Sequence, residues 1–344
     1  MGLNHPRDLA AWQRWQDGRK PLQRLRGQLR PAPPLEAQLT VGGSEPTVLV
    51  VLDSSTPSSR AALEEPIRWL DSERVAVLSS APAIRLLPGE RSRVLPISGV
   101  TDLHRVFPSV RLVVAIGNFL PFGALGHGLA IRNHLPFFVV QHGLMTPFAP
   151  PLPVGAHLLA WSQVDGDFWR SGRDDVTFEV AGSQLLWDAR RSTSLTDPAT
   201  PPTYLGQLHG AELPRRDLAR AAAAFCLEHG AVYRPHPSER DLLSRGQHAL
   251  WRRRGLRFDT SGGEIAELGT PIVSVFSTGV LEAASAGIPA WVDYPAPPAW
   301  LEELWDRYDL ARWGGAPTLP PTPPPVEPAR RIAEIMLAHL EGVR

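Results

Sequence analysis

Short apolar runs alternate with helical stretches along most of this chain, and no other feature of the sequence constrains its fold as much. In the first half the apolar runs lie at residues 47–52, 75–78, 111–116, 137–140, 158–161 and 176–180. Helical patterns occur in three of the gaps, at 59–70, 120–133 and 163–171. Strands of a parallel sheet are buried on both faces and are apolar throughout, so this pattern predicts a parallel sheet covered by helices.

The same alternation restarts after a stretch that lacks apolar periodicity. Residues 188–203 are rich in Ser, Thr, Asp and Pro, which is typical of a linker. Beyond it we expect strands at 203–208, 231–233, 256–258, 271–276 and 289–292, with helices at 215–229, 238–245, 263–268 and 279–286. The sequence therefore predicts an α/β fold of two Rossmann-like, doubly wound domains that face a cleft, where a ligand would bind.

The domain limits follow from these two repeats. We expect an irregular or helical extension at 1–45, a first Rossmann-like domain at 46–187, a linker at 188–203, a second Rossmann-like domain at 204–316, and a Pro-rich segment with a final helix at 317–344. Within the extension, residues 9–29 place Trp and Leu at helical spacing among many Arg. Such a helix lies either on the protein or on a membrane surface, and we expect the former.

Bulk composition argues against several classes of protein. The 344 residues include 35 basic and 35 acidic side chains, so the net charge of zero gives no reason to expect nucleic acid as a partner. The single cysteine, Cys226, fits a reducing cytoplasm. The start lacks the apolar core of a signal peptide, and glycines and prolines break the uncharged run at 112–131, which argues against a membrane span. We expect a cytoplasmic protein, either free or peripheral at the inner face of the membrane.

One strand-to-helix corner in the second repeat predicts a phosphate site. The run 274–289 reads Ser-Val-Phe-Ser-Thr-Gly-Val-Leu-Glu-Ala-Ala-Ser-Ala-Gly-Ile-Pro. A helix that begins directly after an apolar strand points backbone N–H groups at one place, which suits an anion. Ser277, Thr278 and Gly279 form this corner, and Ser277 and Thr278 add hydroxyl donors. Glu282, one helical turn further on, can accept a hydrogen bond from a ribose hydroxyl.

A second corner, at 233–239, reads Tyr-Arg-Pro-His-Pro-Ser-Glu. Arg234 brings a permanent positive charge, and His236 is a donor that can become cationic. Prolines on both sides of His236, including Pro237, restrict the backbone and favour a preorganised donor. Gln207 ends the first strand of this domain, and with His209 it is expected to border the same pocket.

The first domain offers two candidate bases. His142 directly follows the predicted strand at 137–140, so it is expected at the carboxyl edge of the sheet. Its imidazole can take a proton near neutral pH. A histidine that only caps the next segment would occur in the same sequence pattern. Asp53 ends the first apolar strand, where it is either a carboxylate that acts as a base or the N-cap of a loop.

Several common site motifs do not occur in the sequence. There is no Cys/His set at zinc spacing, no glycine-rich dinucleotide or phosphate loop after a strand, and no Gly-x-Ser-x-Gly elbow. These observations argue against a zinc enzyme, a dehydrogenase, a P-loop NTPase and a serine hydrolase. We expect no metal and no cofactor apart from a nucleotide-activated donor substrate.

Three segments, in this order, resemble the motifs of GT-B glycosyltransferases that act on bacterial surface polymers: residues 141–143 (Gln-His-Gly), 234–237 (Arg-Pro-His-Pro) and 277–284 (Ser-Thr-Gly-Val-Leu-Glu-Ala-Ala). The pattern is similar to CDP-glycerol glycerophosphotransferases of teichoic acid synthesis and to sialyl- and polysialyltransferases that use CMP-sugars. The resemblance covers about residues 112–292.

This resemblance implies roles for individual residues. His236 and Pro237, with Ser277 and Thr278, would bind the phosphate of a cytidine nucleotide. His142 matches the candidate base of the glycerophosphotransferases, with Gln where that family has Trp. The acidic motif of the sialyltransferases has no clear match, and Asp53 is its nearest stand-in.

We therefore expect a metal-independent transferase that moves a group from a CMP- or CDP-linked donor to a cell-surface glycan, or to a lipid-linked or teichoic-acid-type acceptor. His142, or else Asp53, would deprotonate the acceptor hydroxyl. Two alternatives stay open: a UDP-sugar 2-epimerase on the same two-domain plan, and a catalytically silent protein of this fold that binds a polysaccharide or a partner enzyme.

Overall fold

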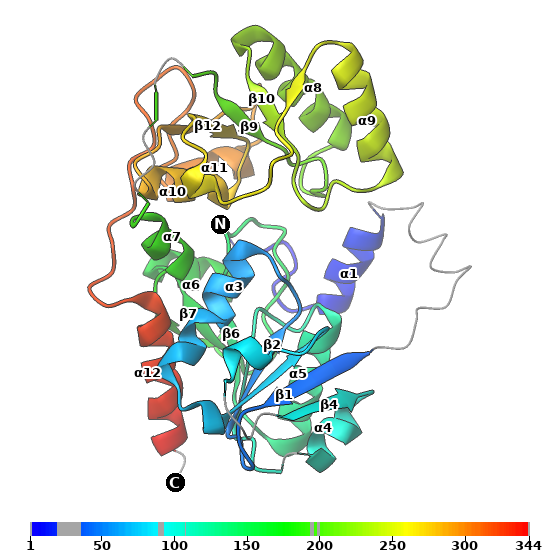
Figure 1. The fold of residues 1–344 in the computed structure, drawn as a ribbon, viewed down its shortest axis with the longest axis vertical. Coiled ribbons are helices and arrows are strands. Elements are labelled where there is room, and N and C mark those ends of the chain that lie inside the picture. Colours follow the sequence, from blue (N-terminus) through cyan, green and yellow to red (C-terminus); the bar gives the residue numbers. More distant parts are fainter. Residues whose placement is uncertain are drawn as a thin grey trace. The chain divides into compact units, whose positions relative to one another are not determined.

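The structure is a computed structural model and describes residues 2–18, 36–88, 93–106, 108–192, 196–197 and 200–342. It divides into two compact units, each a sheet covered by helices (Figure 1). Unit 1 comprises Met1–Leu185 and Pro324–Arg344, and unit 2 comprises Leu186–Pro323. The boundary lies inside helix α7 (Gln184–Ala189), close to the start of the linker predicted at 188–203.

Unit 1 is built on an eight-stranded sheet in the order β4-β1-β3-β2-β5-β6-β7-β8. Its strands are β1 (Ala37–Val41), β2 (Val48–Leu52), β3 (Val75–Ser79), β4 (Arg93–Ile97), β5 (Leu112–Ala115), β6 (Phe137–Val140), β7 (His157–Ala160) and β8 (Thr177–Val180). The six strands from β3 to β8 in this order pair in parallel, as the apolar runs predicted. Their carboxyl ends therefore meet at one edge of the sheet, where ligands bind in folds of this kind.

Strands β1 and β4 were not expected from the sequence. The segment 37–41 was assigned to an irregular extension, yet β1 pairs antiparallel with both β3 and β4. Gln38 and Thr40 interrupt the apolar pattern of β1, and Arg93 and Pro96 interrupt that of β4. Pairing with a preformed strand outweighs this weak local pattern, because the backbone groups of β3 would otherwise lack partners.

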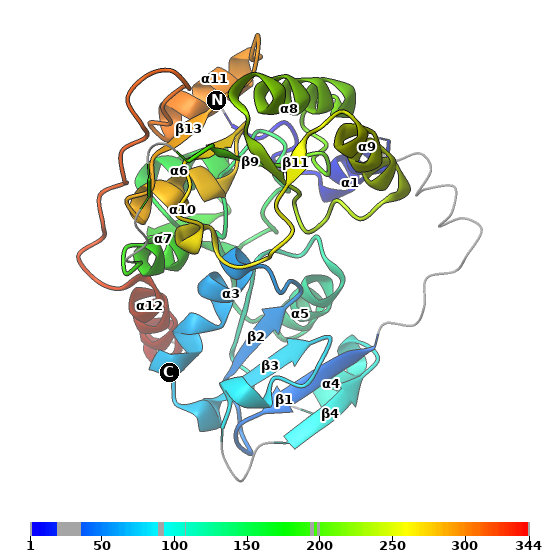
Figure 2. The same ribbon diagram turned by 45° about the horizontal axis from the view of Figure 1, so that its top comes forward.

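Helices cover both faces of this sheet (Figure 2). The helices of unit 1 are α1 (Leu9–Gly18), α3 (Pro57–Leu63), α4 (Val100–Val106), α5 (Pro121–Asn133), α6 (Gln163–Arg170) and α12 (Pro328–Gly342), with 3-10 turns at Glu65–Trp69, Ser72–Arg74 and Ile84–Leu86. Along β2, Leu49 and Val51 enter one apolar core and Val48 and Val50 enter the other. Successive side chains of a strand point to opposite faces, so both faces of the sheet are buried.

The C-terminal helix α12 belongs to unit 1. Ile332, Ala333 and Met336 pack in the same core as Val48 and Val50. Gln184 fixes the start of the helix, because its Oε1 accepts from the backbone N–H of Ala329 at 2.8 Å. The chain thus returns to its first unit after completing the second.

The N-terminal helix α1 packs on unit 1. The Trp12 indole N–H donates to the carbonyl of Phe148 at 2.7 Å, and the Trp15 ring stacks on the Phe148 ring with centroids 5.0 Å apart. For residues 9–18 this agrees with the expected packing on the protein. The rest of the predicted amphipathic helix, at 19–29, lies outside the described residues.

Unit 2 contains five parallel strands in the order β11-β10-β9-β12-β13. They are β9 (Thr203–Leu205), β10 (Val232–Arg234), β11 (Arg257–Phe258), β12 (Ile272–Ser274) and β13 (Ala290–Val292). Counted along the chain, the spatial order is third, second, first, fourth and fifth, which is the doubly wound order of a Rossmann sheet. The winding reverses between β9 and β12, and this switch point is where such sheets bind ligands.

The helices of unit 2 follow the predicted alternation with three differences. They are α8 (Arg215–His229), α9 (Leu242–Arg253), α10 (Thr278–Ser285) and α11 (Ala299–Arg307). Helix α11 was not expected. Helix α9 begins later than predicted because Asp241 is its N-cap and accepts from the backbone N–H of Ser244. The segment 263–268 forms only a 3-10 turn, Ile265–Glu267, after two glycines with positive φ.

Within these described ranges no helix has both the length and the apolar character needed to cross a membrane.

Candidate functional site

Three loops of unit 2 meet beyond the carboxyl edge of its sheet. The loop after β9 lies between the other two, because β9 pairs with both β10 and β12. In this middle loop, the Gln207 Oε1 accepts from the backbone N–H of Phe276 at 3.0 Å and from the Ser274 hydroxyl at 3.1 Å. On the other side, the His209 ring stacks on the His236 ring with centroids 3.7 Å apart. Gln207 and His209 thus join the two predicted corners into one region.

His236 is held in one tautomer. Its Nδ1 accepts from the backbone N–H of Ser238 at 3.1 Å, so the proton of the neutral ring is on Nε2. Burial lowers the pKa of His236, and the nearby charge of Glu239 only partly offsets this. Pro237, next in the chain, is exposed and restricts the backbone of the turn. At neutral pH this geometry presents a neutral ring with one fixed N–H donor.

A buried carboxylate supports the His236 loop. Glu239 is 4% exposed and accepts from the Leu208 backbone N–H (3.0 Å), the Tyr233 hydroxyl (2.9 Å) and the His248 Nε2 (2.9 Å). Burial raises the pKa of Glu239, but these hydrogen bonds outweigh it and the net shift is downward. A Cβ at Gly206 would overlap the Tyr233 hydroxyl, so glycine is required there. This cluster ties the β9 loop to the His236 loop.

The other corner is the start of helix α10. Ser277 is the N-cap, and its Oγ accepts from the backbone N–H of Gly279 at 3.1 Å. Thr278 is the first helical residue. A Cβ at Gly279 would lie 2.5 Å from Ile265 Cδ1 and 2.6 Å from Leu205 Cδ1, so this glycine lets the helix approach the end of β9. The N-terminus of α10 therefore opens at the switch point, where its N–H groups and dipole favour an anion.

Arg234 does not present an unpaired charge. Its guanidinium donates to Asp259 Oδ2 at 2.8 Å and to the carbonyls of Gly262 and Gly263 at 2.9 and 2.6 Å. Asp259 neutralises the charge, and the two carbonyls fix the loop that follows β11. Arg234 was expected among the residues that bind the nucleotide; in the structure its guanidinium positions a loop beside the site.

Glu282 is also used within the protein. Its carboxylate is 7% exposed and accepts from the backbone N–H groups of Ile265 and Ala266. Burial and the neighbouring charge of Glu264 raise the pKa of Glu282 to about 7, although these two hydrogen bonds act in the opposite direction. A ribose hydroxyl bound at Glu282 would therefore compete with the backbone N–H groups of the 3-10 turn Ile265–Glu267 for the same carboxylate.

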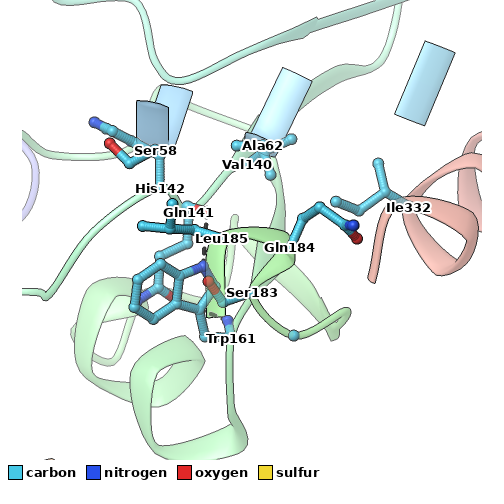
Figure 3. A pocket seen from close by; sticks show the side chains of 11 residues that line it. Ser58, Ala62, Val140, Gln141, His142, Trp161, Ser183, Gln184, Leu185 and Ile332 are labelled. Carbon is cyan, nitrogen blue, oxygen red and sulfur yellow. Dashed lines mark hydrogen bonds between the residues drawn. The ribbon is translucent and has the colours of Figure 1, made fainter. Parts of the chain in front are cut away.

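In unit 1, hydrogen bonds hold the backbone on both sides of His142. Gln141 is 1% exposed; its Oε1 accepts from the Trp161 backbone N–H at 2.8 Å, and its Nε2 donates to the Gly143 carbonyl at 3.1 Å. The Trp161 indole N–H donates back to the Gln141 carbonyl at 2.9 Å (Figure 3). These bonds join the ends of β6 and β7 and restrict the position of His142.

His142 lines a small pocket together with Ser58, Trp161, Ser183 and Leu185 (Figure 3). The free volume is about 10 Å³, room for a single water molecule. Burial lowers the pKa of His142 to about 4, while the Val140 carbonyl acts in the opposite direction. The Nδ1 atom is buried and has no hydrogen-bond partner in the described part of the chain. At neutral pH the imidazole of His142 is therefore uncharged.

Asp53 caps a helix. Its Oδ1 accepts from the Phe122 backbone N–H at 2.8 Å, and its Oδ2 accepts from that of Gly123 at 2.6 Å. These are the first turn of α5, whose own N-cap residue, Leu120, offers no side-chain acceptor. Burial raises the pKa of Asp53, and the two N–H groups lower it only in part. Both carboxylate oxygens of Asp53 are therefore engaged in capping α5.

Sequence analysis did not single out Glu239, His248 or Trp161. The first two meet only because β10 and α9 pack together, and no local pattern marks Glu239 as buried. One signal existed: Ser244, His248 and Trp251 lie on one face of α9, so two polar groups accompany the aromatic residue on its buried side. Among the residues described, no three His, Cys, Asp or Glu side chains are grouped as metal ligands.

No protein-family model matches this chain, and no curated protein matches its sequence. Among solved structures it is similar to UDP-GlcNAc 2-epimerase from Methanocaldococcus jannaschii in complex with UDP-GlcNAc and UDP. The TM-score is 0.50 at 13% identity, over 86% of this chain and 99% of that chain. A candidate UDP-N-acetylglucosamine 2-epimerase from Listeria monocytogenes gives a TM-score of 0.48 at 11% identity, over 86% of this chain and 88% of that chain.

At such low identity the similarity shows the fold alone. The conclusion about the fold uses only the first of these structures, with its TM-score of 0.50. Together with the two sheets described above, this similarity confirms the predicted α/β fold of two Rossmann-like domains of the GT-B-like class.

Proposed function

We propose that this protein is a GT-B glycosyltransferase, or an enzyme of the glycerophosphotransferase kind, that uses a nucleotide-activated donor. The observation that carries the proposal is the assembly at the β9/β12 switch point. His236, with its proton on Nε2, and the N-terminus of α10 at Ser277 belong to loops that Gln207 and His209 join. Neutral N–H and O–H donors at a Rossmann switch point suit the phosphate of a nucleotide.

The proposed chemistry is a group transfer. The acceptor oxygen attacks the donor carbon, the bond from that carbon to the phosphate oxygen breaks, and the nucleotide leaves with the bonding electrons. With a glycerophosphate donor the attack is at phosphorus and a nucleoside monophosphate leaves. In either case His236 and the first turn of α10 stabilise the negative charge that grows on the phosphate oxygens. The neutral His142 takes the proton of the acceptor hydroxyl.

The motif resemblance favours a cytidine nucleotide, so the proposed donor is CMP- or CDP-linked. The proposed acceptor is a cell-surface glycan, or a lipid-linked or teichoic-acid-type polymer reached at the inner face of the membrane. We expect turnover without a metal ion, so that addition of EDTA leaves the rate unchanged.

A thermal-unfolding series with CMP, CDP, UDP and GDP at one fixed concentration tests the nucleotide site. A ligand present at about 100 times its Kd adds roughly 2.7 kcal/mol to the free energy of unfolding, so the preferred nucleotide is identified by the largest rise in Tm. His236→Ala should abolish this rise and reduce kcat on the order of 10²–10³-fold. If no nucleotide raises the Tm at millimolar concentration, the proposal is wrong and a silent binding protein is the better reading.

A UDP-sugar 2-epimerase is the second candidate, because the structure with the TM-score of 0.50 is such an enzyme in complex with UDP-GlcNAc and UDP. Proton NMR of UDP-GlcNAc incubated with the protein in D2O separates the two. An epimerase inverts a carbon that bears a hydrogen, so it forms the epimer and exchanges that hydrogen without any acceptor. A transferase leaves the donor sugar unchanged under the same conditions.

A further inference from the structure

Helix α9 presents a face that the proposed nucleotide site does not use. The helix packs on unit 2 through Ser244, His248 and Trp251, which are buried. Leu242, Leu243 and Leu250 are 61%, 59% and 43% exposed. At 100° per residue these three leucines lie on the side of the helix opposite to the buried residues. Figures 1 and 2 both show α9 at the outside of its unit, beside α8.

The helix and the turns at its two ends are rich in arginine. Residues 240–257 contain six arginines: Arg240, Arg245, Arg252, Arg253, Arg254 and Arg257. They contain one acidic residue, Asp241, which caps the helix and pairs with Arg215. Arg245, Arg253 and Arg254 are exposed, and none of them forms an ion pair with a described residue. In a chain with a net charge of zero, this positive charge is concentrated in one place.

We infer that α9 docks unit 2 on an anionic lipid bilayer. The α9 surface consists of Leu242, Leu243 and Leu250 with Arg245, Arg253 and Arg254. Leucines enter the boundary between headgroups and acyl chains, while the exposed arginines beside them contact lipid phosphates. Exposed leucines are costly in water, and an arginine can lie along an apolar surface with its guanidinium at the headgroup level.

The side chains favour a bilayer over a nucleic acid. Single-stranded nucleic acids bind basic grooves that offer aromatic rings for stacking with bases. On α9 the Trp251 ring is 1% exposed, and the guanidinium of Arg252 covers the Phe258 ring at 4.2 Å from its centroid. What remains accessible is aliphatic and cationic, which is the chemistry of a bilayer-binding helix. The inference goes beyond the proposed function, because none of these residues belongs to the nucleotide site.

Sedimentation with lipid vesicles, in the absence of any nucleotide, tests the inference on the full chain. The wild-type protein should sediment with vesicles that contain phosphatidylglycerol and stay in solution with pure phosphatidylcholine. Added salt should weaken the binding, because it screens surface charge. The triple variant Arg245→Gln, Arg253→Gln, Arg254→Gln should bind on the order of 100-fold more weakly. The triple variant Leu242→Ser, Leu243→Ser, Leu250→Ser should bind on the order of 100-fold more weakly as well.

Matched controls keep the result specific. Arg132→Gln with Arg216→Gln removes exposed arginines elsewhere, and Leu227→Ser with Leu319→Ser removes leucines that are 57% and 77% exposed; neither pair should change vesicle binding. Far-UV circular dichroism and the Tm check that each variant is folded. The inference is overturned if the wild-type protein does not bind anionic vesicles, or if both α9 variants bind them as tightly as the wild type does. Capture of a single-stranded RNA without vesicle binding would identify a different partner and also overturn it.

Discussion

The carboxyl edges of the two sheets hold their polar residues in different ways. In unit 2, Gln207, Arg234, Glu239 and Glu282 bond to neighbouring loops and build a rigid frame around His236 and the start of α10. In unit 1 the same edge is simpler: Gln141 fixes the turn, Asp53 caps a helix, and His142 keeps one buried nitrogen without a partner in the described part of the chain.

Residue type alone therefore does not distinguish a side chain that binds a ligand from one that holds the protein's own loops in place. Arginine and glutamate beside a strand end suggest contacts with phosphate and ribose, yet in unit 2 they hold backbone atoms. What remains for a ligand is smaller: one imidazole N–H, a helix N-terminus and a neutral histidine. Changes in the frame of unit 2 should therefore alter stability first, whereas a change at His142 should alter turnover.

The largest expected effect is on turnover, at His142. His142→Asn should lower kcat by about 10²–10⁴-fold with little change in Tm, because it removes a proton acceptor from a polar pocket. Since the pKa of His142 is about 4, the wild-type rate should stay level from pH 8 to about pH 5 and fall only as the ring becomes protonated. Ser58→Ala, in the same pocket, is the matched control. An acid limb near the ordinary histidine pKa would contradict this assignment.

The next effect is on stability, at Glu239. Glu239→Ala should lower the free energy of unfolding by about 3–5 kcal/mol, because Tyr233, His248 and the Leu208 N–H lose a buried acceptor. The pKa of Glu239 is lowered in the folded state, so its contribution is present above the pKa of the unfolded chain and is lost as the pH falls. Urea unfolding measures this loss. Glu228→Ala, whose side chain is 74% exposed, should change almost nothing.

Glu282 should show the opposite pH dependence. Its folded pKa, about 7, lies above the ordinary glutamate value of 4.5. The protonated form is therefore the one that the fold favours, and stability is fully present below pH 4.5 and declines as the pH rises through 7. Glu282→Gln should remove this decline, a difference of about 2–3 kcal/mol between pH 5 and pH 8 in chemical unfolding. Equal slopes for the variant and the wild type would show that the carboxylate is not held as described.

The smallest expected effect, at the N-caps of two helices, compares the carboxyl edges of the two sheets most directly. Ser277→Ala should cost about 1 kcal/mol of stability through the lost N-cap of α10, and it should also weaken nucleotide binding. Thr56→Ala removes the equivalent cap of α3 in unit 1, where the Thr56 side chain accepts from the Ser59 N–H. It should cost a similar amount of stability and leave nucleotide affinity unchanged. Calorimetry with the preferred nucleotide makes the comparison, and equal affinities for both variants would refute the role of Ser277.

Much of the fold could be predicted because buried strands and helices carry a recognisable apolar pattern in the sequence. The six parallel strands of unit 1 and the five of unit 2 each coincide with a predicted apolar run, and helix α8 has the predicted bounds. Strands β1 and β4 were missed because Gln38, Thr40 and Pro96 interrupt their apolar patterns. They form by pairing with distant segments: β1 pairs with β3, and β4 pairs with β1. The 3-10 turn Ile265–Glu267 depends on a carboxylate that lies further along the chain, at Glu282.

For the site, the sequence alone determined which corners follow strands and therefore which residues share an edge of each sheet, since this depends only on strand order and chain direction. The tertiary structure decided which of those side chains are already engaged. Arg234 bonds to Asp259, Glu239 bonds to His248, and Asp53 caps a helix that begins at Pro121. A hydrogen bond is settled by which partner comes within about 3 Å, and that proximity arises only when separate segments pack together.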